Sequence, residues 1–196
     1  MKIYHISSLN KSLFLSINNL SLNSGFFINY INIFIALYSP FILAALLIIA
    51  YLAGKKNESL YAFYASIIGL FINFIIGFFY FHPRPFAAGL GHQLIYHAND
   101  SSFPSDHATL AFSIAFSFII LDKKKLLGIL CLIFAFIISF ARVYVGVHFP
   151  FDIVGSFIVS LFSTIIIYVS RKPLGEVNNF LIAIQMRLAK KLNIII

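Results

Sequence analysis

The chain has 196 residues, of which 61% are hydrophobic and 10% are charged, and its mean hydropathy is +0.96. A soluble domain carries about 25% charged residues, because it must cover itself with a polar surface. This composition excludes a soluble protein and indicates that the lipid bilayer is the main solvent of the chain. The net charge of +8 argues poorly for nucleic-acid binding, since the basic residues are scattered over short loops.

Five apolar segments predict transmembrane helices, each approaching the ~20 residues that cross about 30 Å of hydrocarbon. They run about Tyr30–Leu52, Leu60–Phe81, His107–Leu121, Leu126–Phe140 and Ile153–Ser170. The third and fourth segments are short, and we expect them to continue as helix into the polar residues beside them. The prediction is an all-α, polytopic membrane helix bundle with about five transmembrane helices.

The two ends of the chain are more polar than these spans. Ser8–Leu22 places Leu and Ile at near-helical spacing among polar residues, and Asn178–Ile196 alternates apolar with basic residues. Each segment is either a helix in the membrane interface or a partly ordered tail. We expect no cleavable signal peptide, because residues 1–28 lack an apolar core. The expected division is an N-terminal interfacial segment (1–28), a transmembrane domain (29–172) and a cytoplasmic amphipathic tail (173–196).

Basic residues predict the orientation of the bundle. With the loops Lys55–Glu58 and Asp122–Lys125 and the C-terminal tail on one side, that side holds ten of the fourteen Lys and Arg residues. These are Lys55, Lys56, Lys123, Lys124, Lys125, Arg171, Lys172, Arg187, Lys190 and Lys191. The opposite side holds Lys2, Lys11, Arg84 and Arg142. The positive-inside rule makes the first side cytoplasmic, so the segments 81–106 and 142–152 face outward.

Ionisable residues concentrate in these two outward segments. Residues 82–107 read HPRPFAAGLGHQLIYHANDSSFPSDH, and residues 141–152 read ARVYVGVHFPFD. Together they contain five of the six His and three of the six acidic residues. Ionisable groups at a membrane face are unfavourable unless they serve a function, so this concentration indicates a functional site.

The residue types in the two segments favour phosphate chemistry. Arg84 and Arg142 carry planar, permanently charged guanidinium groups that suit phosphate oxygens. Ser105 stands where the third span begins, and a helix N-terminus presents free N–H groups to an anion. 

A second set of residues predicts a nucleophile and an acid. His148 and Asp152 lie four residues apart, so the carboxylate can reach one ring nitrogen and leave the other free to attack. This is the arrangement of a catalytic triad with histidine as the nucleophile. His107 remains to donate a proton to a leaving group.

The segments resemble the three motifs of the type-2 phosphatidic acid phosphatase superfamily, which are Lys-x6-Arg-Pro, Pro-Ser-Gly-His and Ser-Arg-x5-His-x3-Asp. Arg84-Pro85 matches the end of the first motif, and residues 104–107 match the second with Asp106 in place of Gly. The third motif is matched in type and spacing by Arg142, His148 and Asp152, with Ala at position 141 in place of Ser. The resemblance covers about residues 78–155.

Within the superfamily, the Pro-Ser-Asp-His variant with its HPRPF segment and Asp-Ser-Ser-Phe lead-in resembles the bacterial undecaprenyl-diphosphatase branch of the bacitracin-resistance type. The resemblance implies hydrolysis of undecaprenyl diphosphate on the outer face of the cytoplasmic membrane, without a cofactor or metal ion. It implies that His148 is the nucleophile, that Asp152 orients it and that His107 is the general acid. The implied substrate-binding residues are Arg84, Pro85, Ser105, Asp106 and Arg142.

Two positions depart from the wider family. Gly77 stands where the first motif has Lys, and the chain has no Lys between Lys56 and Lys123. The resembling branch commonly lacks this Lys too, so we interpret its absence as a trait of the branch. Asp106 adds negative charge beside an anion site, and it either compensates the helix dipole or contacts the substrate.

Other interpretations remain. His82, His92 and His97 with Asp100 match no standard zinc spacing, which argues against a metal site. Asn73, within the second span, predicts an interhelical hydrogen bond rather than a substrate contact. Alternative enzymes are a phosphatidylglycerophosphate phosphatase, a lipid A phosphatase or a lipid phosphotransferase. A non-catalytic transporter or a bacitracin-binding resistance protein is the alternative of another class, and the intact set of Arg, His and Asp argues against it. The sequence defines neither the lipid chain nor the oligomeric state.

The orientation is testable by cysteine labelling in intact cells. Lys124→Cys should be shielded from a membrane-impermeant thiol reagent, while His97→Cys should react, because the two positions lie on opposite sides of the membrane. The measurement is the extent of labelling before and after permeabilisation. Reversed labelling would place the outward segments in the cytoplasm.

Overall fold

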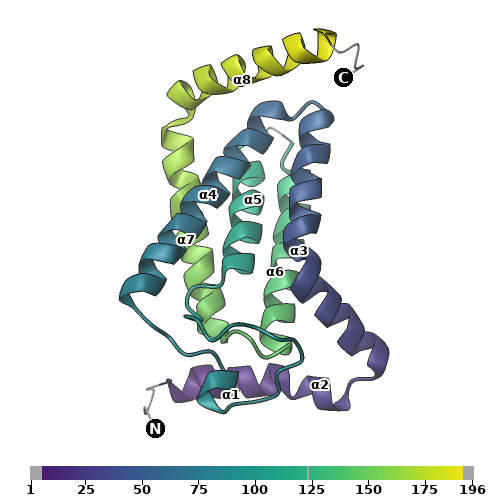
Figure 1. Ribbon diagram of the computed structural model, residues 1–196, viewed down its shortest axis with the longest axis vertical. Helices are drawn as coiled ribbons and strands as arrows, with labels where there is room; N and C mark the ends of the chain where they lie inside the picture. The colour runs from purple at the N-terminus through teal and green to yellow at the C-terminus, as the bar shows by residue number, and fades with distance from the viewer. Residues whose placement is uncertain (1–5, 123, 192–196) are drawn as a thin grey trace.

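Long apolar segments separated by short polar turns organise the chain into eight α-helices and one 3₁₀ turn within residues 6–122 and 124–191, which the computed structural model describes. The helices are α1 (Ser8–Asn18), α2 (Leu20–Asn23), α3 (Phe26–Leu52), α4 (Lys56–Phe79), α5 (Asp106–Leu121), α6 (Leu126–Tyr144), α7 (Pro150–Val169) and α8 (Arg171–Lys191), with the turn η1 at Phe86–Ala88. Helices α3 to α7 run alternately up and down, α1 and α2 lie across one end, and α8 lies across the other (Figure 1). The predicted all-α membrane helix bundle is confirmed.

Four helices, α3, α4, α6 and α7, are long and apolar enough to cross a membrane. The third predicted span is α5, which has only 16 residues, ten of them buried among α4, α6 and α7. At a rise of 1.5 Å per residue such a helix covers ~24 Å, less than the ~30 Å of hydrocarbon. The five expected spans are therefore four full-length apolar helices around a shorter, buried one. The fourth predicted span does continue as helix into its motif, through Arg142 to Tyr144.

Small and polar side chains bring α4, α5 and α7 close together. A Cβ atom added at Gly69 of α4 would lie 2.9 Å from Cγ2 of Thr109 on α5. Asn73 Nδ2 donates to Thr109 Oγ1 at 2.9 Å, and Ser160 Oγ of α7 donates to the Thr109 carbonyl at 2.9 Å. Close approach through small residues, with interhelical hydrogen bonds, is how helices associate in lipid. The predicted interhelical bond of Asn73 is confirmed.

Both polar flanks are helical where the structure describes them, as α1 with α2 at the N-terminal side and as α8 at the C-terminal side. At the α8 end, Lys55 pairs with Asp122 at 2.5 Å, which joins the α3–α4 and α5–α6 loops. Tyr61 Oη donates to the Arg171 carbonyl at 2.9 Å, which attaches the start of α8. The predicted basic segments thus lie at one end of the bundle, and the motif segments lie at the other (Figure 1). Residues 1–5, Lys123 and residues 192–196, on which parts of these predictions fall, lie outside the described residues.

Candidate active site

The two motif segments pack against each other at the end of the bundle that carries α1. The segment between α4 and α5 folds back on itself, with the Ser102 amide donating to the His82 carbonyl at 2.7 Å. It also reaches the turn between α6 and α7, where the Leu94 amide donates to the Val145 carbonyl at 3.0 Å. These backbone contacts bring residues that are far apart in the sequence around one imidazole, that of His148.

His148 lies in the turn between α6 and α7, and its side chain is 2% exposed. Its Nδ1 lies 2.9 Å from the carbonyl oxygen of Ser102 and 3.5 Å from Asp152 Oδ2. Both neighbours accept hydrogen bonds, so Nδ1 carries the proton and Nε2 keeps its lone pair. Nε2 faces Arg84 Nη1 at 3.2 Å and Arg142 Nη2 at 3.5 Å, both of which can only donate. The geometry therefore presents an imidazole lone pair between two cations.

Asp152 occupies the first turn of α7, and its carboxylate is bound from several sides. Oδ2 accepts from the Phe149 amide at 2.8 Å and from the Ser102 hydroxyl. The expected pairing with His148 places the two groups together at 3.5 Å, but the nearer acceptor of the Nδ1 proton is the Ser102 carbonyl. Ser102 thus contacts both His148 and Asp152. Sequence reasoning gave it no role, and the available signal was its position two residues before the Pro-Ser-Asp-His motif.

Arg84 and Arg142 are buried, at 4% and 2% exposure, and both point toward His148. Arg84 donates to the carbonyls of Val147 at 2.9 Å and Ser101 at 3.3 Å, and its Nε donates to Asp100 Oδ1 at 2.7 Å. Arg142 donates to the Ala36 carbonyl at 3.0 Å. Asp100 offsets part of the charge of Arg84, but the carbonyl oxygens orient the guanidinium groups without neutralising charge, so Arg142 in particular retains positive charge that suits an anion.

The second motif lies beside these cations, with one correction. Ser105 Oγ is buried and has no hydrogen-bond partner among the described residues, which leaves it available to a ligand. Its backbone amide, expected to be free for an anion, instead donates to Ser156 Oγ at 2.8 Å, because α7 packs directly against this residue. No described side chain caps α5. His107 is half-buried and close enough to interact electrostatically with His148 and Arg84.

The two remaining predicted binding residues differ from each other. Asp106 is exposed, and its Oδ1 accepts from Asn73 Nδ2 at 2.9 Å. Pro85 precedes η1, and its carbonyl accepts from the amides of Ala88 and Leu90, so its visible contacts shape the turn that follows Arg84. The structure brings Arg84, Ser105, His107, Arg142, His148 and Asp152 together and leaves Asp106 and Pro85 at the border.

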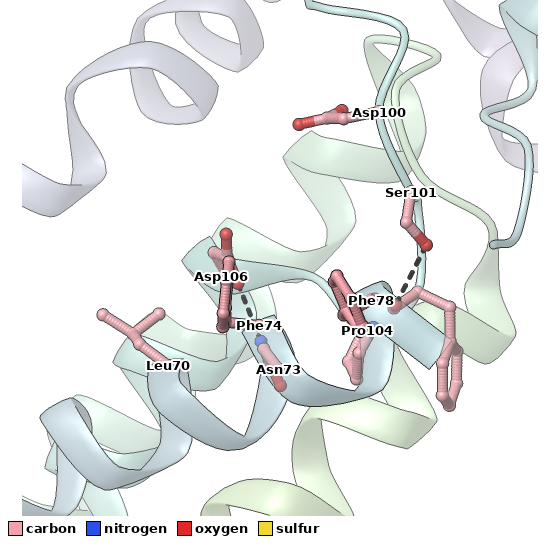
Figure 2. Close-up of a pocket in the computed structure, with 10 residues that line it drawn as sticks. Leu70, Asn73, Phe74, Phe78, Asp100, Ser101, Pro104 and Asp106 are labelled. Carbon is pink, nitrogen blue, oxygen red and sulfur yellow. Dashed lines mark hydrogen bonds between the residues drawn. The ribbon is translucent and has the colours of Figure 1, made fainter. Parts of the chain in front are cut away.

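A cleft of about 310 Å³ opens beside Asp106 (Figure 2). One wall comes from α4, and the other comes from the segment that leads into α5. It is lined by Leu70, Asn73, Phe74, Gly77, Phe78, Asp100, Ser101, Phe103, Pro104 and Asp106. Gly77, which replaces the Lys of the family motif, faces this space, and a Cβ there would lie 3.6 Å from Ser101 Cβ. The cleft is lined by the side chains of Asp100 and Asp106 and by apolar side chains of α4.

The remaining histidines of the two segments lie apart from one another. His82 Nδ1 is 3.4 Å from Asp152 Oδ1, and the His97 ring is 6.3 Å from the His148 ring, measured between centroids. The His92 amide donates to Asn18 on α1. Among the described residues, no three His, Cys, Asp or Glu side chains gather as ligands of a metal ion.

Burial and charge set the protonation of the groups outside the helices. Burial lowers the pKa of His148 to about 3, and the neighbouring cations Arg142 and Arg84 act in the same direction against the opposing effect of Asp152. Burial also lowers the pKa of His97, with Arg84 contributing. For Asp100, burial raises the pKa, but the hydrogen bond and charge of Arg84 outweigh it and leave the pKa below its usual range. The site thus combines a neutral imidazole with a charged carboxylate and two guanidinium groups.

Comparison with known proteins agrees with this geometry. Residues 58–175, more than half of the chain, match the model of the PAP2 superfamily. The chain belongs to the PAP2 superfamily. Undecaprenyl-diphosphatase BcrC of Bacillus subtilis (strain 168) is 37% identical over 156 residues, which cover 78% of this chain and 79% of that protein. Bacitracin transport permease protein BcrC of Bacillus licheniformis is 31% identical over 179 residues, covering 89% and 87%.

A solved structure shares the fold of this PAP2 protein. The crystal structure of Aquifex aeolicus LpxE superposes with a TM-score of 0.72 at 25% sequence identity, covering 85% of this chain and 99% of that one. The family match includes all three motifs but leaves out α1, α2 and α3.

The protonation of His148 can be measured by NMR of protein labelled with ¹³C at histidine Cε1. Because the lowered pKa keeps the ring neutral above about pH 3, the His148 resonance should not titrate between pH 8 and pH 5. A free imidazole, with a pKa of about 6.5, would titrate in this range. His148→Gln assigns the resonance, and Arg84→Gln should raise the His148 pKa by removing a nearby cation. A midpoint above pH 5 in the unmodified protein would contradict this account.

Proposed function

We propose that this protein hydrolyses undecaprenyl diphosphate to undecaprenyl phosphate and phosphate, through a phosphohistidine intermediate on His148. The observation that carries the proposal is the lone pair of His148 Nε2, which faces two buried arginines. The relative from Bacillus subtilis, named undecaprenyl-diphosphatase, supports the substrate. Such a reaction would regenerate the lipid carrier that cell-wall synthesis requires.

In the first step, Nε2 attacks the terminal phosphorus, and the bond from this phosphorus to the bridging oxygen breaks. Arg84 and Arg142 stabilise the charge on the phosphoryl oxygens, since catalysis of phosphoryl transfer consists mostly of positioning and electrostatic stabilisation. The imidazole becomes positively charged as the new bond forms. Its Nδ1 proton is held by the Ser102 carbonyl and Asp152, which stabilise that charge. The negative charge of the bound diphosphate favours the protonated form of His107, and this protonated ring donates a proton to the departing lipid phosphate.

In the second step, water attacks the phosphorus of phosphohistidine and the P–N bond breaks. His107, deprotonated in the first step, accepts the proton of the water, and the electron pair of the bond returns to His148 Nε2. Inorganic phosphate leaves, and the site returns to its starting protonation. No cofactor takes part in the proposed cycle.

The location follows from the distribution of charge. The basic loops and α8 lie at one end of the bundle, and the reacting groups lie at the other. With the basic end in the cytoplasm, the site opens on the outer face of the cytoplasmic membrane. A lipid diphosphate anchored in that leaflet would approach His148 from this face of the membrane.

The nucleophile can be trapped chemically. His148→Ala should abolish phosphate release, and brief reaction of the unmodified protein should leave acid-labile, base-stable phosphate on His148. Asp152→Asn should slow turnover by about 10- to 100-fold, less than the ~10⁴-fold seen when a triad Asp sets the tautomer alone, because the Ser102 carbonyl still holds the Nδ1 proton. Substantial turnover by His148→Ala would refute the mechanism.

The assignment of His107 as the acid is tested by comparing two substrates. A lipid phosphate leaving group has a second pKa of about 6, whereas a lipid monophosphate must expel an alkoxide, for which water with a pKa of about 15.7 is a rough guide. The alkoxide therefore depends more on a proton donor, whose contribution is typically ~10²–10⁴-fold. His107→Ala should raise the diphosphate-to-monophosphate rate ratio at least about tenfold, measured at one pH with one lipid chain. An unchanged ratio would mean that His107 binds phosphate instead.

A further inference from the structure

The catalytic turn is held at both ends by α1, a helix that lies outside the residues matched to the family. At the α6 end, Asn18 Nδ2 donates to the Tyr144 carbonyl at 2.8 Å. At the α7 end, the Phe151 amide donates to Asn10 Oδ1 at 3.1 Å. His148 lies between these two attachment points. One helix therefore brackets the turn that carries the nucleophile.

Asn18 also ties the turn to the segment that carries Arg84. Its Nδ2 donates to the His92 carbonyl at 2.9 Å, and its Oδ1 accepts from the His92 amide at 2.6 Å. The side chain is completely buried. Gly146 lies directly against His92, with φ of +84°, and a Cβ atom at Gly146 would overlap the His92 carbonyl. Asn18 thus joins both motif segments where their backbones touch.

Apolar packing lies between the two asparagines. Phe14 is completely buried, and its ring meets that of Phe149 edge to face, with centroids 5.2 Å apart. Asn10, Phe14 and Asn18 are spaced by four residues, so they share one face of α1. This face carries two buried amides and an aromatic ring against the residues that flank His148, while Leu9 and Leu13 on another face are exposed.

We propose that α1 is a positioning element of the catalytic site, in which Asn18 and Asn10 hold the two ends of the His148 turn and thereby set the direction of Nε2. The inference rests on the proposed function, because direction matters through the attack on phosphorus. Neither asparagine contacts Arg84, Arg142 or Asp152 through a hydrogen bond among the described residues. They act through the backbone of the turn. A misplacement of about 1 Å in a catalytic group can slow a reaction about 10²-fold, so a small shift of the turn is sufficient.

The first test is Asn18→Asp, which keeps the shape of the side chain but replaces its donor with oxygen. This oxygen would face the carbonyls of Tyr144 and His92, and the turn would lose its attachment at the α6 end. We expect kcat for a lipid diphosphate to fall by about 10- to 100-fold with KM changed by less than about threefold. The matched control is Asn19→Asp, because Asn19 is the next residue, is exposed and makes no side-chain capping hydrogen bond to α2. Thermal unfolding in detergent gives the folded fraction to which kcat is normalised.

A second variant and a readout independent of catalysis complete the test. Asn10→Ala removes the attachment at the α7 end and should also lower kcat rather than raise KM, with Asn19→Ala as its control. If Asn18→Asp does not fold, Asn10→Ala by itself tests the positioning role of α1. Hydrogen–deuterium exchange of the peptide covering residues 144–151 should become faster in both variants and remain unchanged in the controls.

The outcomes separate this inference from the proposed function. Unmodified protein that releases no phosphate from any lipid diphosphate would refute the proposed function, while amide exchange would still test the attachment. Variants with kcat within twofold of their controls, or with kcat lowered only in proportion to the folded fraction, would overturn the positioning role. Unchanged exchange in residues 144–151 would overturn it as well.

Discussion

The structure depends on two buried guanidinium groups that no nearby carboxylate fully neutralises. A buried cation is unfavourable unless it is hydrogen-bonded and paired. Arg84 donates hydrogen bonds to the backbone carbonyls of Val147 and Ser101, and Arg142 donates one to the carbonyl of Ala36. The one carboxylate that pairs with Arg84 belongs to the exposed Asp100. Val147 and Ser101 belong to loops at this end of the bundle and Ala36 belongs to α3, so both loops and a helix direct carbonyls at the arginines. The positive charge that remains is the basis for binding an anion.

Burial and the same two cations act together on the imidazole of His148. The ring is held neutral, because burial disfavours its charged form and a third positive charge beside the arginines would be unfavourable. Its proton is confined to Nδ1 by the Ser102 carbonyl and Asp152, so its lone pair faces the cations. An arriving phosphoryl group would satisfy the arginines and meet the lone pair at once. The same arrangement of groups would therefore serve both the binding of the phosphoryl group and the attack on its phosphorus.

The helices place these groups by bringing small residues into contact deep in the bundle. The first turn of α5 lies at the end of the bundle that carries the arginines, and Ser156 of α7 holds the Ser105 backbone there. Asn73 of α4 orients Asp106 at the start of α5. The polar contacts lie at one end, and the α8 end carries the basic loops. The motif segments and the basic loops thus lie at opposite ends of one bundle.

Some features of this protein follow from the sequence by itself. Apolar length predicts helices in lipid, charge counts predict an orientation, and the four-residue spacing of His148 and Asp152 predicts that the carboxylate can reach the ring, because these properties depend on composition and local geometry. The all-α bundle and the grouping of motif residues at one end were predictable for this reason, and the family was predictable from the resemblance of the three motifs. The short third span was predictable too, since the expected His107–Leu121 agrees with α5 at Asp106–Leu121 to within one residue. The burial of α5 among α4, α6 and α7 was not, because hydropathy does not distinguish a helix that faces lipid from one that other helices surround.

Only the tertiary structure decided which atoms meet across long sequence separations. Ser102 contacts His148 over 46 residues, and Asn18 contacts Tyr144 over 126. The Ser105 amide, expected to be free from its place at a helix start, is taken by Ser156, 51 residues away. In the sequence, a side chain such as that of Ser102 is recognisable only as a polar residue in a loop beside a motif. Its partner is set by how the helices pack and where the chain folds back, and neither is encoded in local spacing.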